Sequence, residues 1–181
     1  MSYRMRLYLN RMYRLDSNVC VLVSHTSQYW LVRDCFRVVS RLGDGALWYS
    51  LMIGILIING VQGATPVLHM AIAGLIGTLV YKWLKDKTLR PRPYEVHQDV
   101  WLTGKPLDKF SFPSGHTLHA VIFSLVALSY YPQLAMIVLP FTVMIGLSRV
   151  VLGLHYPSDV LAGAGIGALI AGLSFLMVSL F

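Results

Sequence analysis

Charged residues are absent from three long stretches of this 181-residue chain. None occurs in residues 45–81, in residues 110–148 or after Asp159. Stretches of this length can cross a bilayer, where only helices and closed barrels satisfy their own backbone hydrogen bonds. Charged residues make up 13% of the chain, about half the fraction in a soluble domain. This composition excludes a soluble enzyme, a disordered tail and a coiled coil, and it predicts an integral membrane protein.

The apolar segments divide into five transmembrane helices of an all-α bundle. The predicted spans are residues 45–60, 64–84, 117–131, 133–152 and 160–181. The first span is short, so we expect it to extend into residues 42–44 or to cross a thinned bilayer. In the last span, Gly163, Gly167 and Ala171 recur at four-residue spacing. Small residues at this spacing favour the close approach of a neighbouring helix.

Residues 1–41 differ in character from the predicted membrane domain at residues 42–181. Seven arginines occur there among aromatic residues, a composition typical of a segment at the membrane surface. They are Arg4, Arg6, Arg11, Arg14, Arg33, Arg37 and Arg41. We therefore predict an interfacial N-terminal segment, with residues 19–39 as a weak sixth span. We expect neither a cleaved secretory signal nor a disulfide framework.

The long polar segment between the second and third predicted spans contains two candidate phosphate-binding groups. Lys85 is followed by Arg92 after six intervening residues, and Pro91 and Pro93 restrict the backbone around Arg92. A guanidinium fork and an ammonium point charge together suit a phosphate group. Basic residues next to a span also attract anionic lipid headgroups, and this alternative stays open for the segment taken alone.

A Pro-Ser-Gly-His sequence immediately precedes the third predicted span. Ser114 is placed to act as the helix N-cap, and Gly115 lets a ligand come close to the backbone. The free N–H groups of the first helical turn then form an anion site. His116 in this turn can deliver a proton to a leaving oxygen. The alternative is an ordinary capped helix with an interfacial histidine.

A third cluster lies at the beginning of the last predicted span. Asp159 follows His155 by four residues, so its carboxylate can orient one imidazole nitrogen and leave the other free as a nucleophile or base. Pro157 favours a helix that starts after Tyr156. Arg149 ends an otherwise uncharged span, and a charge that borders lipid is a functional candidate. The alternative is a snorkelling arginine beside a surface His–Asp pair.

Together the three clusters resemble the motifs of the type 2 phosphatidic acid phosphatase family, the membrane branch of a superfamily that includes vanadate-dependent haloperoxidases. The family motifs are Lys-x6-Arg-Pro, Pro-Ser-Gly-His and Ser-Arg-x5-His-x3-Asp. Every specified position is present, at Lys85, Arg92, Pro93, Pro113, Ser114, Gly115, His116, Ser148, Arg149, His155 and Asp159. The resemblance covers roughly residues 42–176 and leaves the N-terminal segment unexplained.

The resemblance implies a metal-independent phosphatase that acts through a phosphohistidine. His155 would be the nucleophile, Asp159 its orienting partner and His116 the general acid. The phosphoryl oxygens would be held by Lys85, Arg92, Arg149, the Ser114 hydroxyl and the Gly115 N–H. Because one imidazole must be neutral while the other is protonated, the activity is expected to be bell-shaped in pH.

A metal-dependent mechanism is the main chemical alternative. His116 and His119 lie three residues apart on a predicted helix, and His155 with Asp159 could complete a zinc set. A two-metal phosphatase needs several carboxylates, however, and Asp159 is the only acid near the motifs with an evident role. We therefore expect no metal and no other cofactor. His69 lies inside an apolar span and is expected to be a hydrogen-bonded packing residue.

The resemblance also implies a lipid phosphate as substrate. Undecaprenyl diphosphate is expected first, with phosphatidylglycerophosphate or phosphatidic acid as alternatives. The expected location is the bacterial inner membrane with an extracytoplasmic active site, although the positive-inside rule favours the cytoplasm for the basic side. No nucleic-acid partner is expected, and the oligomeric state stays open. Alternatives of other classes are a non-catalytic lipid-binding or transport module and a haloperoxidase, which would be soluble.

Overall fold

The computed structural model describes residues 3–178 of the chain, and the side chains of residues 13–178. Its α-helices are α1 (Tyr3–Ser24), α2 (Trp30–Arg41), α3 (Leu47–Asn59), α4 (Ala64–Thr88), α5 (Pro93–Val96), α6 (Gly115–Tyr130), α7 (Ala135–Val151) and α8 (Pro157–Val178). Three short 3-10 turns and a π-helical segment, Leu42–Ala46, lie between them. The described residues contain no strand, which confirms the predicted all-α class.

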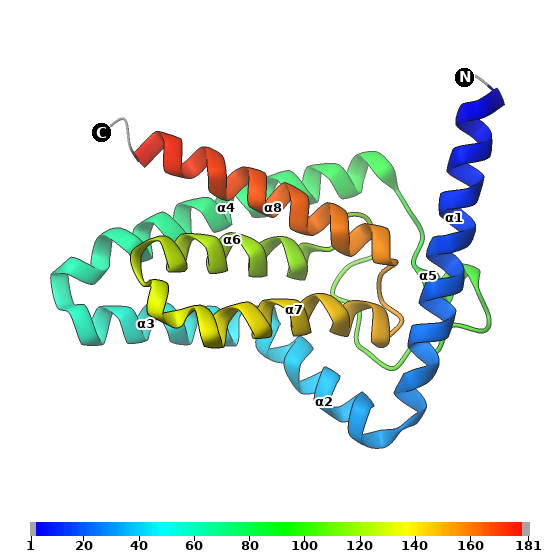
Figure 1. Ribbon diagram of the computed structural model, residues 1–181, viewed down its shortest axis with the longest axis horizontal. Coiled ribbons are helices and arrows are strands. Elements are labelled where there is room, and N and C mark those ends of the chain that lie inside the picture. Colours follow the sequence, from blue (N-terminus) through cyan, green and yellow to red (C-terminus); the bar gives the residue numbers. More distant parts are fainter. Residues whose placement is uncertain (1–2, 179–181) are drawn as a thin grey trace.

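Helices α3, α4, α6, α7 and α8 form the bundle (Figure 1). They correspond to the five predicted spans, except that residues 179–181 of the last one lie outside the described residues. The extension of the short first span into residues 42–44 stays a prediction, because a kink within the π-helical segment Leu42–Ala46 separates these residues from α3. Within this segment Gly45 has a φ of 137°, a backbone conformation that residues other than glycine rarely adopt. The segment therefore changes the direction of the chain as it enters the bundle.

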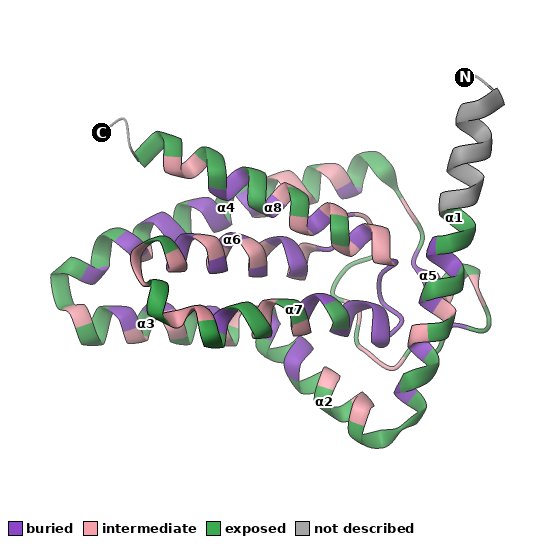
Figure 2. Cartoon of the chain, in the orientation of Figure 1, coloured by how far each residue is buried: buried purple, intermediate pink, exposed green. Residues whose placement is uncertain are grey.

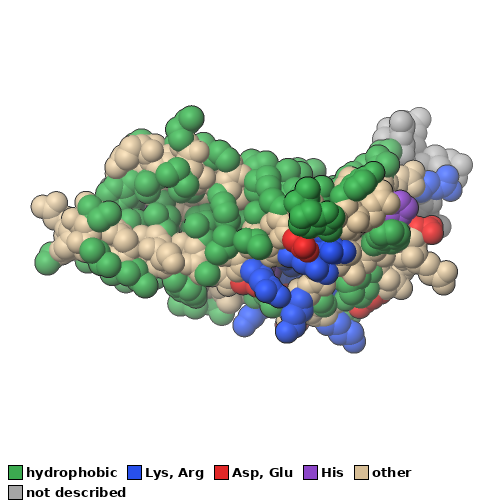
Figure 3. Space-filling view, turned by 90° about the horizontal axis from the view of Figure 1, so that it is seen from below, with side chains coloured by type: hydrophobic (Ala, Val, Ile, Leu, Met, Phe, Trp, Pro, Cys, Tyr) green, Lys and Arg blue, Asp and Glu red, His purple; other side chains and the backbone are tan. Residues whose placement is uncertain are grey.

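The outer surface of the bundle is apolar along its length, while several charged side chains are buried inside it. Ile58 and Met136 are 82% and 87% exposed, and Arg92 and Arg149 are each 1% exposed. Figure 2 shows the burial pattern, and Figure 3 shows hydrophobic side chains over most of one face with Lys and Arg gathered toward one end. Apolar side chains face outward where the solvent is lipid. The chain is an integral membrane protein.

The N-terminal helices lie at one end of the bundle. Helix α1 runs across this end and contacts α7 and α8 (Figure 1). The turn His25–Gln28 and an extended Tyr29 separate α1 from α2, which packs on α7. Residues 19–39 are thus divided between two helices of different direction, and the weak sixth span is wrong. The side chains of Arg4, Arg6 and Arg11, three of the predicted interfacial arginines, lie outside the described residues.

Helices α6 and α8 pack closely through the small residues of α8. A Cβ atom added at Gly163 would lie 2.5 Å from the carbonyl oxygen of Ser114, and one added at Gly167 would lie 2.6 Å from that of Leu118. Ala171, the third residue of the series, is fully buried. The predicted close approach is confirmed, and it holds the beginning of α6 against the beginning of α8.

Replacement of Gly167 by leucine is expected to destabilise the fold. The new side chain would collide with the backbone of α6, and overpacking of this kind costs about 1–3 kcal/mol or more. Gly165 is the matched control, because nothing lies within 4 Å of a Cβ at that position on the same helix. We expect the thermal unfolding midpoint in detergent to fall for Gly167→Leu and to stay near wild type for Gly165→Leu. Equal midpoints for the two variants would contradict the close packing.

Candidate active site

The three sequence motifs meet around one cavity of about 620 Å³ at the end of the bundle that α1 crosses. Among its lining residues are Lys85, Arg92, Gly115, His116, Arg149 and His155. They come from the end of α4, the residue before α5, the first turn of α6, the end of α7 and the connection from α7 to α8. Segments distant in the sequence thus supply cations, imidazoles and a helix N-terminus to the same space.

Lys85 and Arg92 share the carboxylate of Asp108, a side chain that is 38% exposed. The Nζ of Lys85 donates to Asp108 Oδ1 at 2.6 Å, and an Nη atom of Arg92 donates to the same oxygen at 2.7 Å. Burial alone would raise the pKa of Asp108, but the hydrogen bonds and charges of Lys85 and Arg92 lower it. The carboxylate is therefore ionised at neutral pH and fixes both cations at the cavity wall.

Arg149 has an unused hydrogen-bond donor at the cavity. Its Nη1 donates to the hydroxyl of Ser40 at 2.5 Å. Its Nε finds no acceptor among the described residues, although the side chain is almost fully buried. Buried polar atoms normally have partners, so an orphaned guanidinium donor beside a cavity indicates a place for an anion.

The first turn of α6 forms another part of the cavity wall. Ser114 caps the helix as predicted, with its Oγ 3.5 Å from the backbone nitrogen of Thr117 and 3.0 Å from the Thr117 hydroxyl. The backbone N–H of Ser114 donates to the carbonyl of Asp159 at 3.0 Å. Gly115 and His116 follow in the first turn and line the cavity. The positive end of a 16-residue helix thus borders the same cavity as the cations.

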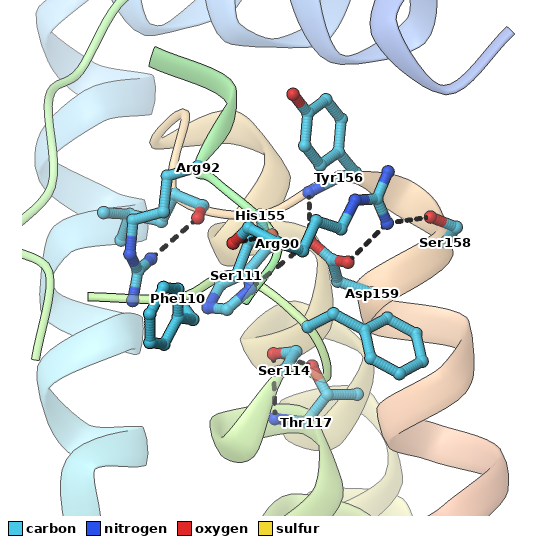
Figure 4. Close-up of polar contacts among 12 residues, drawn as sticks. Arg90, Arg92, Phe110, Ser111, Ser114, Thr117, His155, Tyr156, Ser158 and Asp159 are labelled. Atoms are coloured by element: carbon cyan, nitrogen blue, oxygen red, sulfur yellow. Dashed lines mark hydrogen bonds and ion pairs between the residues drawn. The ribbon is translucent and has the colours of Figure 1, made fainter. Parts of the chain in front are cut away.

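His155 lies in the connection between α7 and α8, next to the carboxylate of Asp159 (Figure 4). Helix α8 begins at Pro157, as predicted. The His155 Nδ1 is 3.6 Å from Asp159 Oδ2, an ion-pair distance that is too long for the expected hydrogen bond. Asp159 Oδ2 instead accepts from the backbone N–H of Tyr156 at 2.9 Å. Catalytic hydrogen bonds often tighten only when substrate is bound.

Burial and the neighbouring cations favour the neutral form of His155. Burial, followed by the charges of Arg149, Arg92 and Lys85, lowers the pKa of His155 well below its usual value. A neutral imidazole with Nδ1 toward a carboxylate presents Nε2 as a lone pair, which is the state that a nucleophile requires.

His116 is paired with an acid that the sequence reasoning missed. Its Nε2 contacts the carboxylate of Asp44, which lies in the π-helical segment before α3. The expectation that Asp159 is the only acid near the motifs with an evident role is therefore wrong, since Asp44 and Asp108 both contact site residues. Asp44 stands between two glycines immediately before an uncharged span, and this isolation was the available signal.

The proposed zinc set does not assemble around the cavity. His119 lines the same cavity, but both its ring nitrogens are engaged, with Nδ1 2.8 Å from the Gly115 carbonyl and Nε2 3.0 Å from the Thr78 hydroxyl. In the part of the chain that the structure describes, no group of three or more His, Cys, Asp or Glu is arranged to hold a metal ion. His69 is a packing residue as predicted, hydrogen-bonded to the hydroxyls of Tyr130 and Ser174.

Comparison with known proteins identifies the family. Residues 63–181 match the sequence profile of the PAP2 superfamily. The chain belongs to this superfamily. The match begins before α4 and includes all three motifs, whereas α1, α2, α3 and Asp44 lie outside it.

Two curated relatives of this PAP2 protein are named for different phosphatase activities. It is 30% identical over 129 residues to the undecaprenyl-diphosphatase BcrC of Bacillus subtilis, a match covering 71% of this chain and 66% of the relative. It is 31% identical over 110 residues to a lipid A 1-phosphatase of Rhizobium johnstonii, covering 59% of this chain and 43% of the relative. The match thus spans less than two thirds of either relative.

Two solved structures share the fold of this PAP2 protein. The crystal structure of Aquifex aeolicus LpxE superposes with a TM-score of 0.75 at 29% identity, covering 87% of this chain and 93% of that one. The PAP2-type phosphatidylglycerolphosphate phosphatase of Bacillus subtilis gives 0.67 at 24% identity, covering 94% and 87%. At this lower identity, the second similarity supports the shared fold only.

Proposed function

We propose that this protein is a metal-independent lipid phosphate phosphatase that hydrolyses a phosphomonoester or diphosphate headgroup. The observation that carries the proposal is the composition of the cavity wall. At one end lie cations, three imidazoles and a helix N-terminus, and the other end is apolar. A substrate that fits both ends has an anionic head and a hydrophobic tail. The names of the two curated relatives support the same substrate class.

The apolar end of the cavity lies between α3 and α4. Its walls include Trp48 and Met52 from α3, Leu75 from α4 and Phe123 from α6. Leu75 is 61% exposed and Tyr49, also in the lining, is 65% exposed, so the cavity reaches the lipid-facing surface of the bundle. A lipid tail can remain in the bilayer while its headgroup occupies the polar end.

The first half-reaction transfers the phosphoryl group to His155. The Nε2 lone pair attacks phosphorus, the bond from phosphorus to the leaving oxygen breaks, and protonated His116 gives its proton to that oxygen. Negative charge spreads over the equatorial oxygens, where Lys85, Arg92 and Arg149 stabilise it together with the Ser114 hydroxyl and the Gly115 N–H. Asp159 orients the His155 ring and balances its positive charge.

The second half-reaction releases phosphate. A water molecule attacks the phosphohistidine, His116 accepts a proton from this water, and the phosphorus–nitrogen bond breaks to restore neutral His155. Asp44 holds the His116 ring in both steps, because its carboxylate already contacts Nε2. The two imidazoles must start in opposite protonation states, so we retain the expectation of a bell-shaped pH profile.

Loss of the general acid should depend on the leaving group. We expect His116→Ala to lower the hydrolysis of a lipid phosphomonoester about 10²–10⁴-fold, the usual contribution of a positioned acid. With p-nitrophenyl phosphate the loss should be much smaller, because nitrophenolate leaves without a proton. The matched control is His25→Ala, an exposed histidine outside the cavity. Equal losses on both substrates would contradict the role of His116 as the acid.

The substrate is tested by phosphate release from a panel of lipid phosphates in detergent with EDTA present. Undecaprenyl diphosphate is our first expectation, and the panel also includes phosphatidylglycerophosphate, phosphatidic acid and a lipid A 1-phosphate. Release in EDTA that is absent from His155→Ala would support the proposal. Activity that requires added zinc would overturn the metal-independent scheme. Lipid binding without any release would favour the non-catalytic module.

We also propose that the cavity faces the outside of a bacterial inner membrane. One added cysteine at a time tests this orientation, in a background where exposed Cys35 is replaced by serine and buried Cys20 is kept. Lys105→Cys lies in the exposed loop at the cavity end, and Val61→Cys lies in the turn between α3 and α4. An impermeant maleimide should label Lys105→Cys in intact cells and Val61→Cys only after permeabilisation. The reverse pattern would refute the outward site.

The N-terminal helices fit the proposed interfacial segment. On α2, Trp30 and Leu31 are each 64% exposed, while Arg33 and Arg37 lie on the same short helix with Asp34 between them. Apolar and basic side chains on one amphipathic helix suit the boundary between acyl chains and headgroups. We therefore assign residues 1–41 to the membrane surface at the cavity end.

A further inference from the structure

The carboxylate of Asp159 is held by an arginine that belongs to none of the three motifs. Nη1 of Arg90 donates to Asp159 Oδ1 at 2.6 Å (Figure 4). The other oxygen, Oδ2, faces His155 and the backbone N–H of Tyr156. The guanidinium of Arg90 also lies over the Tyr156 ring, 4.1 Å from its centroid. Arg90 is not among the residues that line the cavity, so it contacts the orienting acid from behind.

Arg90 is held in turn by an acid of helix α1. Its Nη2 donates to Asp16 Oδ2 at 2.6 Å, and its Nη1 also donates to the Ser158 hydroxyl at 2.8 Å. The same Asp16 accepts the backbone N–H of Ser158 at 2.9 Å through Oδ1, and the Ser158 hydroxyl donates to its Oδ2. Asp16 is 8% exposed and therefore largely removed from water. One carboxylate thus fixes both the arginine and the first turn of α8.

These contacts form a chain of charged groups that runs from the nucleophile to the N-terminal segment. We propose that Arg90 is a positioning residue for the His155–Asp159 pair, and that Asp16 of α1 completes the pair's support by fixing Arg90. The inference rests on the proposed function, in which His155 attacks phosphorus. Asp16 lies outside the segment that matches the family profile, and the chain of contacts gives a role to the N-terminal part of this protein.

The carboxylate of Asp159 depends on Arg90 because it is fully buried. The Asp159 side chain is 0% exposed, and a buried charge is costly unless a counter-charge and hydrogen bonds accompany it. Arg90 supplies the counter-charge to the oxygen that does not face His155. Without Arg90, the buried charge of Asp159 becomes energetically costly, and no hydrogen bond to Oδ1 from the arginine fixes the rotamer of its side chain. The His155 ring then loses its orientation. A misplacement of about 1 Å can cost about 10²-fold in rate.

The test compares the full-length enzyme in detergent with Arg90→Gln, Arg90→Lys, Asp16→Asn and the Arg90→Gln/Asp16→Asn double variant. We expect Arg90→Gln to lower kcat about 10²-fold while KM changes less than about threefold, because Arg90 supports the nucleophile and touches no substrate. Arg90→Lys should recover part of the loss. Asp16→Asn should lower kcat less than Arg90→Gln does. The double variant should be no slower than Arg90→Gln, because the effects of two substitutions are not additive when one residue acts through the other.

The matched controls are Arg33→Gln and Asp34→Asn, which break an arginine–aspartate pair on the surface of α2. Both should keep wild-type kcat. If Arg90→Gln lowers only the thermal unfolding midpoint and leaves kcat unchanged, Arg90 stabilises the fold without positioning the His155–Asp159 pair, and the inference is overturned. If Arg90→Gln raises KM and leaves kcat unchanged, Arg90 takes part in substrate binding and the inference is overturned. If the kcat losses of Arg90→Gln and Asp16→Asn are additive in the double variant, Asp16 does not act through Arg90. A wild-type enzyme that hydrolyses no lipid phosphate would overturn the proposed function and this inference with it.

Discussion

Replacement of His155 by alanine is expected to abolish phosphate release from the lipid substrate. The side chain is 1% exposed, and it presents a neutral nitrogen to a cavity lined by cations. Loss of a nucleophile costs about 10⁴-fold or more in kcat, because the remaining groups still bind substrate but form no covalent intermediate. KM should change little. The measurement is phosphate release under saturating substrate.

The covalent intermediate gives this prediction a second measurement. Brief incubation with ³²P-labelled substrate followed by alkaline quenching should leave label on the wild-type protein and none on His155→Ala. His116→Ala should still be labelled by a substrate with a good leaving group, since His155 is intact. Label that persists in His155→Ala would place the nucleophile elsewhere. Phosphate release at the wild-type rate in His155→Ala would refute the proposed mechanism.

Replacement of Arg149 by methionine is expected to lower kcat about 10³-fold, the scale for an arginine that stabilises phosphoryl transfer. The unused Nε and the complete burial of the side chain indicate that its charge serves a bound anion. A buried charge without a partner also costs stability. Methionine of similar length removes that cost, so the thermal unfolding midpoint should stay equal to wild type or rise.

Two further variants define the role of Arg149. Arg149→Lys keeps the charge but loses the planar fork, so we expect activity between those of the wild type and Arg149→Met. Arg33→Met, at a half-buried arginine of α2 outside the cavity, is the control and should keep wild-type kcat. If Arg149→Met unfolds at a lower temperature and retains full activity, Arg149 stabilises the bundle and does not act on phosphate.

Most of the fold was predictable because the bilayer constrains it so strongly. Uncharged segments located α3, α4, α6, α7 and α8, and the small residues of α8 predicted its close packing with α6. The division of residues 19–39 between α1 and α2 was not predictable from hydropathy. It depends on α1 docking across α7 and α8 through side chains such as Asp16, which are tertiary contacts without a local pattern.

The site was predictable wherever a local motif specifies the residue. The motif residues Lys85, Arg92, His116, Arg149 and His155 all line one cavity. The supporting acids were missed, because each reaches the site from a separate segment. Asp44 comes from the π-helical segment, Asp108 from the long loop and Asp16 from α1. No spacing in the sequence relates them to their partners, and their role appears only when the chain is folded.

The cavity reaches the lipid-facing surface between α3 and α4, and under the proposed function this position would determine how a lipid substrate is delivered. A lipid that enters there diffuses in two dimensions within one leaflet, so its effective concentration is a surface density. In mixed micelles the rate should therefore follow the mole fraction of substrate in detergent at fixed bulk concentration. Dilution with extra detergent then slows the enzyme without any loss of protein activity, and kinetic constants for this protein belong in units of surface concentration.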